Sequence, residues 1–284
     1  EIYTLSLHDA LPILLTDDNF ATIAKAIAQG RCIYENIRKS VIFLLSSNFG
    51  EIITMLASVA CGFAAPLKSS HILWINLITD SLPALALGVD EEENKSYMDR
   101  PPRGKDESLF AGGGLNCTCF YGALIALISM VAFLQLPVGI LLRAGNQITP
   151  AAIRTLLVDT ELLNRCQTYA FTVLGMSQLF HAIGMRDVET SLFRMNHLEN
   201  RLMIAAFVIG MGLQLLVTEV PYFVVLFGTC RLTLLEWVKL LVLASMPLFA
   251  HELLVFGSCL GEKVNRENRK EATGQAVSSG GRWS

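Results

Sequence analysis

The sequence predicts an all-α membrane protein with six transmembrane helices and a helical cytoplasmic stalk. Of its 284 residues, 52% are hydrophobic and 17% are charged, whereas a soluble domain usually carries about 25% charged residues. The apolar residues also fall into long runs almost free of charge, which is typical of a polytopic membrane protein. The formal net charge is −3, with no dense basic face. The expected partner is therefore the lipid bilayer and not nucleic acid.

The start of the chain is left out of the fold prediction. Residues 1–13 are similar, residue for residue, to one reading frame of a sequencing adapter, and we expect them to be an artefact. The true chain is then expected to begin further upstream, with N-terminal domains that belong to the same chain. Asn19–Lys39 is predicted to be a helix that leads directly into the membrane. Three isoleucines recur in it near helical spacing, and Asp17-Asp18 precedes it, where the helix dipole favours anions.

Six apolar segments follow, each close to the length that crosses ~30 Å of hydrocarbon at ~1.5 Å per residue. They are Val41–Ala65, Ile72–Val89, Leu115–Leu142, Tyr169–Met185, Leu202–Val220 and Leu234–Leu254. The second is the shortest and the most polar. Lysine and arginine gather on one set of connecting segments, so the positive-inside rule places both ends in the cytoplasm. We expect a multi-pass protein of the cell membrane.

These segments suggest a division of the chain after the adapter-like start. It comprises a stalk region (14–40), a polar transmembrane hairpin (41–89), a cytoplasmic loop (90–114), a four-helix transmembrane domain (115–258) and a disordered cytoplasmic tail (259–284). The tail is assigned as disordered because it is polar and rich in glycine and serine.

Polar side chains inside the hairpin mark the candidate functional site. An acidic side chain at mid-membrane costs about 2.5–3.5 kcal/mol, so it persists where something binds it. Asn48 and Glu51 share one face of the first span because they are three residues apart. Asn76, Thr79 and Asp80 share a face of the second span in the same way.

A proline near these residues is expected to expose further oxygens. Pro83 removes an N–H donor and would clash with the carbonyl of Thr79, so the helix should loosen there. Together the two spans offer carboxylate, amide and hydroxyl oxygens, the ligands that Ca²⁺ prefers. The alternative is that these groups hydrogen-bond between helices. That alternative is favoured for Asn48 or Thr79 alone, and the cation site is favoured for Glu51 with Asp80.

Several motifs along the chain resemble the calcium-pump branch of the P-type ATPases. The resemblance is carried by Gly30-Arg-Cys-Ile-Tyr-Glu-Asn-Ile-Arg-Lys39, Leu44-Leu-Ser-Ser-Asn-Phe-Gly-Glu51, Leu73-Trp-Ile-Asn-Leu-Ile-Thr-Asp80, Leu82-Pro-Ala-Leu-Ala-Leu-Gly88 and Arg100-Pro-Pro-Arg103. It implies that Leu15–Lys39 closes the phosphorylation domain and forms the stalk. The six spans would then be the fifth to tenth helices of a ten-helix pump.

The resemblance also implies which residues bind the transported ion. Asn48, Glu51, Asn76, Thr79 and Asp80 would ligate it between helices. At the position before Glu51, sodium and potassium pumps tend to have proline, and at the position of Asn76 they tend to have an acid. This chain has Gly50 and Asn76 at these two positions, which favours calcium.

Two positions depart from the family pattern. Ser81 stands where the family usually has glycine. The serine is expected to stiffen the loosened turn. Gln178 aligns where pumps with two calcium sites have a glutamate, so it is a candidate sixth ligand, with packing as the alternative. The loss of one anionic ligand predicts a single high-affinity ion.

The chain lacks the motifs that the family uses to hydrolyse ATP. No Asp-Lys-Thr-Gly-Thr or Thr-Gly-Glu-Ser occurs in it, so ATP and Mg²⁺ are expected to act only in a full-length pump, and this part alone is expected to be inactive in hydrolysis. A self-contained six-helix secondary transporter or channel, or a structural membrane subunit, remains an alternative. The choice between calcium and manganese as cargo stays open.

Overall fold

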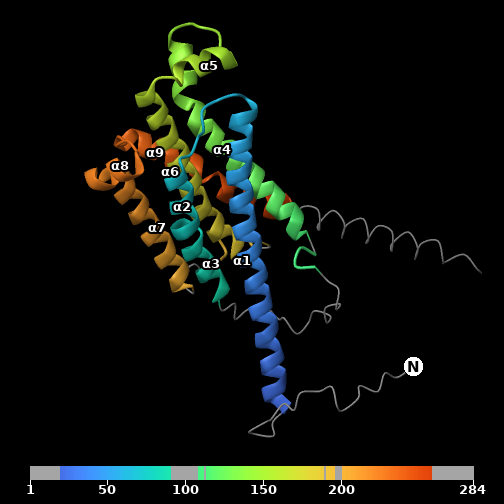
Figure 1. Ribbon diagram of the computed structural model, residues 1–284. Helices are drawn as coiled ribbons and strands as arrows, with labels where there is room; N and C mark the ends of the chain where they lie inside the picture. Colours follow the sequence, from blue (N-terminus) through green and yellow to red (C-terminus); the bar gives the residue numbers. More distant parts are fainter. Residues whose placement is uncertain (1–19, 91–107, 112, 189, 196–199, 258–284) are drawn as a thin grey trace, which may run out of the picture.

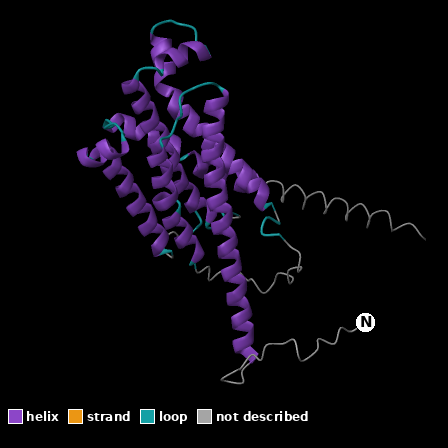
Figure 2. Ribbon diagram, viewed as in Figure 1, coloured by secondary structure: helices purple, strands orange, loops and turns teal. Residues whose placement is uncertain are grey.

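The structure is a computed structural model of a helical bundle (Figure 1). It describes residues 20–90, 108–111, 113–188, 190–195 and 200–257. Within these residues every regular element is a helix and none is a strand (Figure 2), which confirms the predicted fold class. The expectations for the adapter-like start, for the Asp17-Asp18 pair, for Arg100-Pro-Pro-Arg103 and for the tail 259–284 lie outside the described residues.

The predicted stalk and the first span form one continuous helix, α1 (Phe20–Ala60), of 41 residues. Figure 1 shows the N-terminal half of α1 extending beyond the other described helices. At ~1.5 Å per residue, α1 is about twice as long as a hydrocarbon core is thick. Gly62 ends it in the left-handed region (φ 69°). The amide N–H groups of Gly62 and Phe63 donate to the carbonyls of Val59 and Ser58, as in a Schellman motif.

The second span is broken into three pieces. They are α2 (Ser69–Trp74), the π-helical turn η1 (Ile75–Thr79) and α3 (Ser81–Gly88). The Asp80 amide donates to the Ile75 carbonyl at 3.0 Å, a bond that skips one residue more than in an α-helix. Pro83 has no N–H for the Thr79 carbonyl. The predicted loosening is therefore confirmed, and it lies one turn before the proline.

The remaining helices include two short ones that lie between the predicted spans. The helices are α4 (Gly114–Arg143), α5 (Pro150–Leu156), α6 (Thr160–Met185), α7 (Arg201–Glu219), α8 (Pro221–Phe227) and α9 (Leu234–Ala244). A turn at Ser245 interrupts the helix, because Pro247 has no N–H to donate to the preceding turn. The helix continues over residues 246–257. α6 begins at Thr160 and not at Tyr169, since Asp159 caps it by accepting from the Glu161 amide at 3.1 Å.

Four helices of the described residues are long and apolar enough to cross a membrane. They are Ala21–Ala60, Gly114–Arg143, Arg201–Glu219 and Leu234–Gly257. The other two predicted spans fall short for physical reasons: the second is interrupted by η1, and α6, although 26 residues long, is too polar. These two segments run alongside the four in the bundle (Figure 1). The count of six crossings stays a prediction.

The centre of the bundle is α6, which contacts α1, α3, η1, α4, α7 and α9. Its residues 166–179 are all buried, so α6 presents no lipid-facing side there. α4 packs against both α6 and α1. The crossing of α1 and α4 is close because two glycines meet there. A Cβ on Gly122 would lie 2.7 Å from Phe49 Cδ1 and 3.0 Å from the Ser46 carbonyl, and one on Gly50 would lie 2.9 Å from Ile125 Cγ2.

Candidate cation-binding site

Side chains from α1, η1 and α6 meet around Glu51, one residue beyond the Gly50 contact. Glu51 Oε2 accepts a hydrogen bond from Asn76 Nδ2 at 3.0 Å, and Oε1 accepts one from Gln178 Nε2 at 3.4 Å. Glu51 is 5% exposed and Gln178 is fully buried. The structure therefore brings together three of the predicted site residues that lie far apart in the sequence.

Asp80 completes the site at the junction of η1 and α3. Its side chain is 1% exposed, and neither carboxylate oxygen has a hydrogen-bond partner in the structure. Glu51 and Ser47 are neighbours of Asp80. The Ser47 hydroxyl and Gln178 Oε1 are likewise buried without a partner. Buried polar atoms are rarely left unsatisfied, and an ion is one of the accepted explanations.

The other two predicted ligands make local hydrogen bonds. The Asn48 amide is half-buried and donates to the Leu44 carbonyl at 2.8 Å. The Thr79 hydroxyl is buried and donates to the Ile75 carbonyl at 2.8 Å. Neither side chain hydrogen-bonds to Glu51 in the structure. Each hydroxyl or amide oxygen keeps an acceptor position, so their roles as ligands remain predictions.

Ser81 holds the π-helical turn in the manner expected of a stiffening residue. Its hydroxyl donates to the Asn76 carbonyl at 3.1 Å, across the turn that glycine would leave unbridged. Asn76 Nδ2 also donates to the Ile72 carbonyl at 3.0 Å. The amide is therefore shared between Glu51 and the backbone of its own helix.

A residue that the sequence analysis missed extends the polar region to α7. Gln214 is fully buried, its Nε2 donates to Thr172 Oγ1 at 3.4 Å, and its Oε1 has no partner. A Cβ on Gly175 would lie 3.4 Å from Gln214 Oε1 and 3.7 Å from Thr79 Cγ2. This glycine of α6 thus lets both α7 and the second span lie close to α6. A glutamine in the middle of an apolar segment is a signal that could have identified it.

A further hydrogen bond fixes α1 against α6 beside the site. The buried His181 places Nε2 2.9 Å from the Ser46 hydroxyl. The His181 ring also packs 4.3 Å, between centroids, from the ring of Tyr121 on α4. Because His181 follows Gln178 by three residues, this contact holds the face of α6 that carries Gln178 towards α1.

The fold is that of a polytopic helical membrane protein in which buried carboxylate and amide groups from three helices gather at one place. The family model for the C-terminus of cation-transporting ATPases matches residues 64–256. The chain belongs to this family, and the membership predicted from the motifs is confirmed.

Named relatives share most of this chain but extend well beyond it. Calcium-transporting ATPase 1 of Bacillus cereus is 40% identical over 246 residues, which are 86% of this chain and 27% of the relative. The calcium-transporting ATPase of Bacillus subtilis is 37% identical over 255 residues, 90% of this chain and 26% of the relative. Calcium-transporting ATPase 3, endoplasmic reticulum-type, of Arabidopsis thaliana is 28% identical over 263 residues, 89% and 26% respectively. The chain thus spans about a quarter of their length.

Proposed function

We propose that this chain is the cation-binding and translocating part of an ATP-driven calcium pump. The observation that carries the proposal is the buried pair of carboxylates at Glu51 and Asp80, placed beside amide side chains from two helices. Among the residues that the structure describes, neither Asp80 oxygen has a hydrogen-bond partner, which suits a site that binds a cation. The names of the relatives support calcium as the cargo.

The chemistry of the donor set agrees with a hard divalent cation. Calcium accepts six to eight oxygens in variable geometry, and among the described residues no three His, Cys, Asp or Glu side chains are arranged so that they could hold a metal ion together. The site would therefore combine two carboxylates with neutral oxygens. Asn76 and Gln178 now direct N–H groups at Glu51, so binding would require each amide to rotate and present its oxygen. Gln178 in place of an acid favours a single ion, and manganese is the second candidate cargo.

In the complete pump, ATP and Mg²⁺ would act in domains upstream of the stalk. α1 supports this role because it runs without a break from residue 20 into the site. We propose that the protein lies in a cell membrane with both ends in the cytoplasm. A self-contained secondary transporter would explain the carboxylates equally well, but the family match over residues 64–256 favours the pump.

Luminescence of Tb³⁺, a calcium analogue, tests the site directly. Trp74 stands two residues before Asn76 and can sensitise a bound Tb³⁺. In lipid nanodiscs, the protein should give a Tb³⁺ signal that Ca²⁺ displaces, with Mn²⁺ titrated in parallel to compare the two cargoes. Glu51→Gln and Asp80→Asn should each remove the displaceable signal. Glu161→Gln, which neutralises an exposed acid at the start of α6, serves as the control.

The opposite result would reject the proposed site. If the variant with both Glu51→Gln and Asp80→Asn kept the wild-type affinity for Tb³⁺ and Ca²⁺, these carboxylates would not bind the cation. Metal-stimulated ATPase activity of the full-length gene product, assayed with Ca²⁺ and Mn²⁺, then tests the pump itself.

A further inference from the structure

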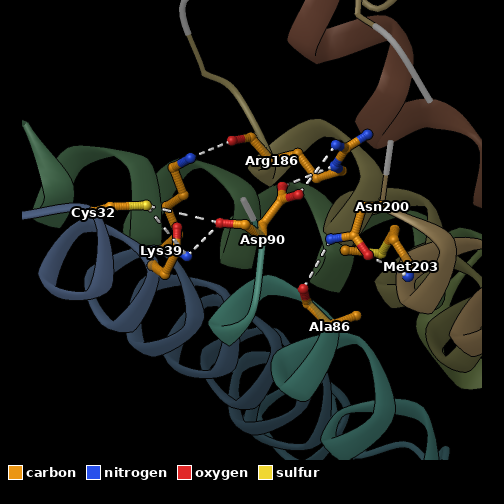
Figure 3. Close-up of polar contacts among 8 residues, drawn as sticks. Cys32, Lys39, Ala86, Asp90, Arg186, Asn200 and Met203 are labelled. Atoms are coloured by element: carbon orange, nitrogen blue, oxygen red, sulfur yellow. Dashed lines mark hydrogen bonds and ion pairs between the residues drawn. The ribbon is translucent and has the colours of Figure 1, made fainter. Parts of the chain in front are cut away.

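The C-terminal end of α3 is enclosed by side chains from neighbouring helices (Figure 3). The last carbonyls of a helix have no partner within it and need one from elsewhere. Here Asn200 Nδ2 donates to the Ala86 carbonyl at 2.9 Å, and Asn36 Nδ2 donates to the Asp90 carbonyl at 2.6 Å. Asn200 also caps α7 by accepting from the Met203 amide at 2.8 Å. The end of α3 is thus bound to both α1 and α7.

An ion pair joins the same point to α6. Arg186 Nε lies 2.9 Å from Asp90 Oδ2, and Arg186 Nη2 lies 3.2 Å from Asp90 Oδ1, a bidentate arrangement. The two side chains are 7% and 1% exposed. Arg186 caps the C-terminus of α6, and its carbonyl accepts from Lys39 Nζ of α1 at 2.5 Å. Asn36, Lys39, Asp90 and Arg186 therefore form a closed ring, which we call the Asp90 joint.

The burial of the ion pair indicates a role in positioning. Removing two charges from water costs about as much as their attraction returns, so a buried ion pair adds little net stability compared with apolar side chains of the same volume. A bidentate arginine–carboxylate pair does fix the relative orientation of the two groups it joins. Asp90 and Arg186 meet this description at the point where α1, α3 and α6 converge.

α3 connects the joint to the cation site. Asp80 stands at its N-cap, and Asp90 follows its C-cap Val89. The eight residues of α3 span only ~12 Å at the usual helical rise. A helix this short moves as a rigid body, whereas η1 on its other side is the loosened turn. A displacement of the joint would therefore move Asp80 together with α3. The backbone of η1 would change conformation to accommodate this movement.

We propose that the Asp90 joint couples the stalk half of α1 to the cation site, with Asp90 and Arg186 as positioning residues. Occupancy of the site would shift α3, and the joint would pass that shift to α1 through Asn36 and Lys39. The inference rests on the proposed function. In a two-state linkage, such coupling changes an equilibrium by roughly 5- to 150-fold.

Hydrogen exchange combined with Tb³⁺ luminescence tests the joint in the whole chain. In nanodiscs, Ca²⁺ should slow exchange both in the site segment 69–80 and in the stalk segment 24–38. The test variant combines Asp90→Asn with Arg186→Gln, so that no buried charge loses its partner. The control combines Arg165→Gln with Glu236→Gln, which removes the 2.6 Å ion pair between α6 and α9. Lys39→Met, which removes the donor to the Arg186 carbonyl and leaves the Asp90–Arg186 ion pair intact, provides a second variant if the double variant folds poorly.

The coupling, and not the binding, should be lost. We expect the test variant to keep the Tb³⁺ signal and the protection at 69–80 within about twofold, while Ca²⁺-dependent protection of 24–38 falls from at least about fivefold to none. The control should retain both. If Ca²⁺ still protected residues 24–38 fully in the test variant, the proposed coupling role of the Asp90 joint would be wrong. Absence of Ca²⁺-displaceable Tb³⁺ in the wild type would instead overturn the proposed function, and the joint with it.

Discussion

At the scale of single residues, Gln178 is a neutral side chain in direct contact with Glu51 of the proposed cation site. Its amide donates to Glu51, and its oxygen has no partner. Gln178→Glu would add a third carboxylate at nearly the same volume. We expect this variant to bind Ca²⁺ about tenfold more tightly, which corresponds to ~1.4 kcal/mol of added attraction. The affinity is measured by Ca²⁺ displacement of Tb³⁺ at a pH where the carboxylates are ionised.

A shorter amide at the same position is the matched control. Gln178→Asn keeps the side chain neutral but moves the amide away from Glu51. This variant should bind Ca²⁺ more weakly than the wild type or equally well. If Gln178→Glu binds no more tightly than Gln178→Asn, the side chain does not face the cation. Gln178 would then be a packing residue, as the alternative interpretation of the sequence holds.

The sequence placed Glu51 and Asp80 in one candidate site but did not name all the polar residues around them. Helical spacing assigns residues to a face of their own helix, and it marked both acids. Spacing does not tell which faces of different helices meet. For that reason Ser47 and Gln214, which belong to the polar region, were missed, and Asn48 was placed among ligands that it does not contact in the structure.

At the scale of elements, the close crossing of α1 and α4 positions Glu51. Gly122→Ala would place a methyl group against Phe49 Cδ1 and the Ser46 carbonyl, at 2.7 and 3.0 Å. The Ser46 carbonyl belongs to a helix backbone and cannot move aside. We therefore expect a loss of about 1–3 kcal/mol in unfolding free energy through overpacking. Thermal unfolding of the protein in nanodiscs measures the effect.

Gly139 on the same helix offers a control of identical chemistry. Nothing lies within 4 Å of a Cβ at this position. Gly139→Ala should therefore be neutral or stabilise the protein by about 0.4–1 kcal/mol, because alanine restricts the unfolded chain. Equal effects of the two substitutions would show that the crossing is looser than the structure indicates.

The short helices show what the sequence analysis could have found among the elements. Thr149 caps α5 by accepting from the Ala152 amide at 3.2 Å, and Pro150 occupies its first position. α8 likewise begins with Pro221 and ends at Gly228, which has a φ of 62°. Proline at the start and glycine past the end are recognised helix signals. Long apolar runs do not reveal these two helices, because each has only seven residues.

At the scale of the whole molecule, the distribution of basic residues predicts the orientation in the membrane. Cys61 is exposed in the turn after α1, and Cys32 lies on the stalk half. In single-cysteine variants, a membrane-impermeant maleimide applied to intact cells should label Cys61. It should label Cys32 only after the membrane is opened, because the positive-inside rule places the stalk in the cytoplasm. Labelling of Cys32 in intact cells would reverse the orientation.

The helical class of the molecule could be predicted because apolar runs are long and charge is sparse. The number of crossings could not be settled in the same way. α6 is surrounded by helices over residues 166–179 and so need not be apolar, and the second span contains a π-helical turn that no hydropathy average reveals. The two segments that carry Asn76, Asp80 and Gln178 are therefore the least like ordinary membrane spans.

The unbroken length of α1 has a mechanical consequence. It contains no proline and makes about eleven turns between Phe20 and Ala60. The half that carries Glu51 packs against α4 and α6, whereas the N-terminal half extends beyond the other described helices (Figure 1). A sideways force at residue 20, ~46 Å from Glu51 along the axis, would therefore act through a long lever arm. Its pivot would lie at Asn36 and Lys39, where hydrogen bonds hold α1 to Asp90 and Arg186.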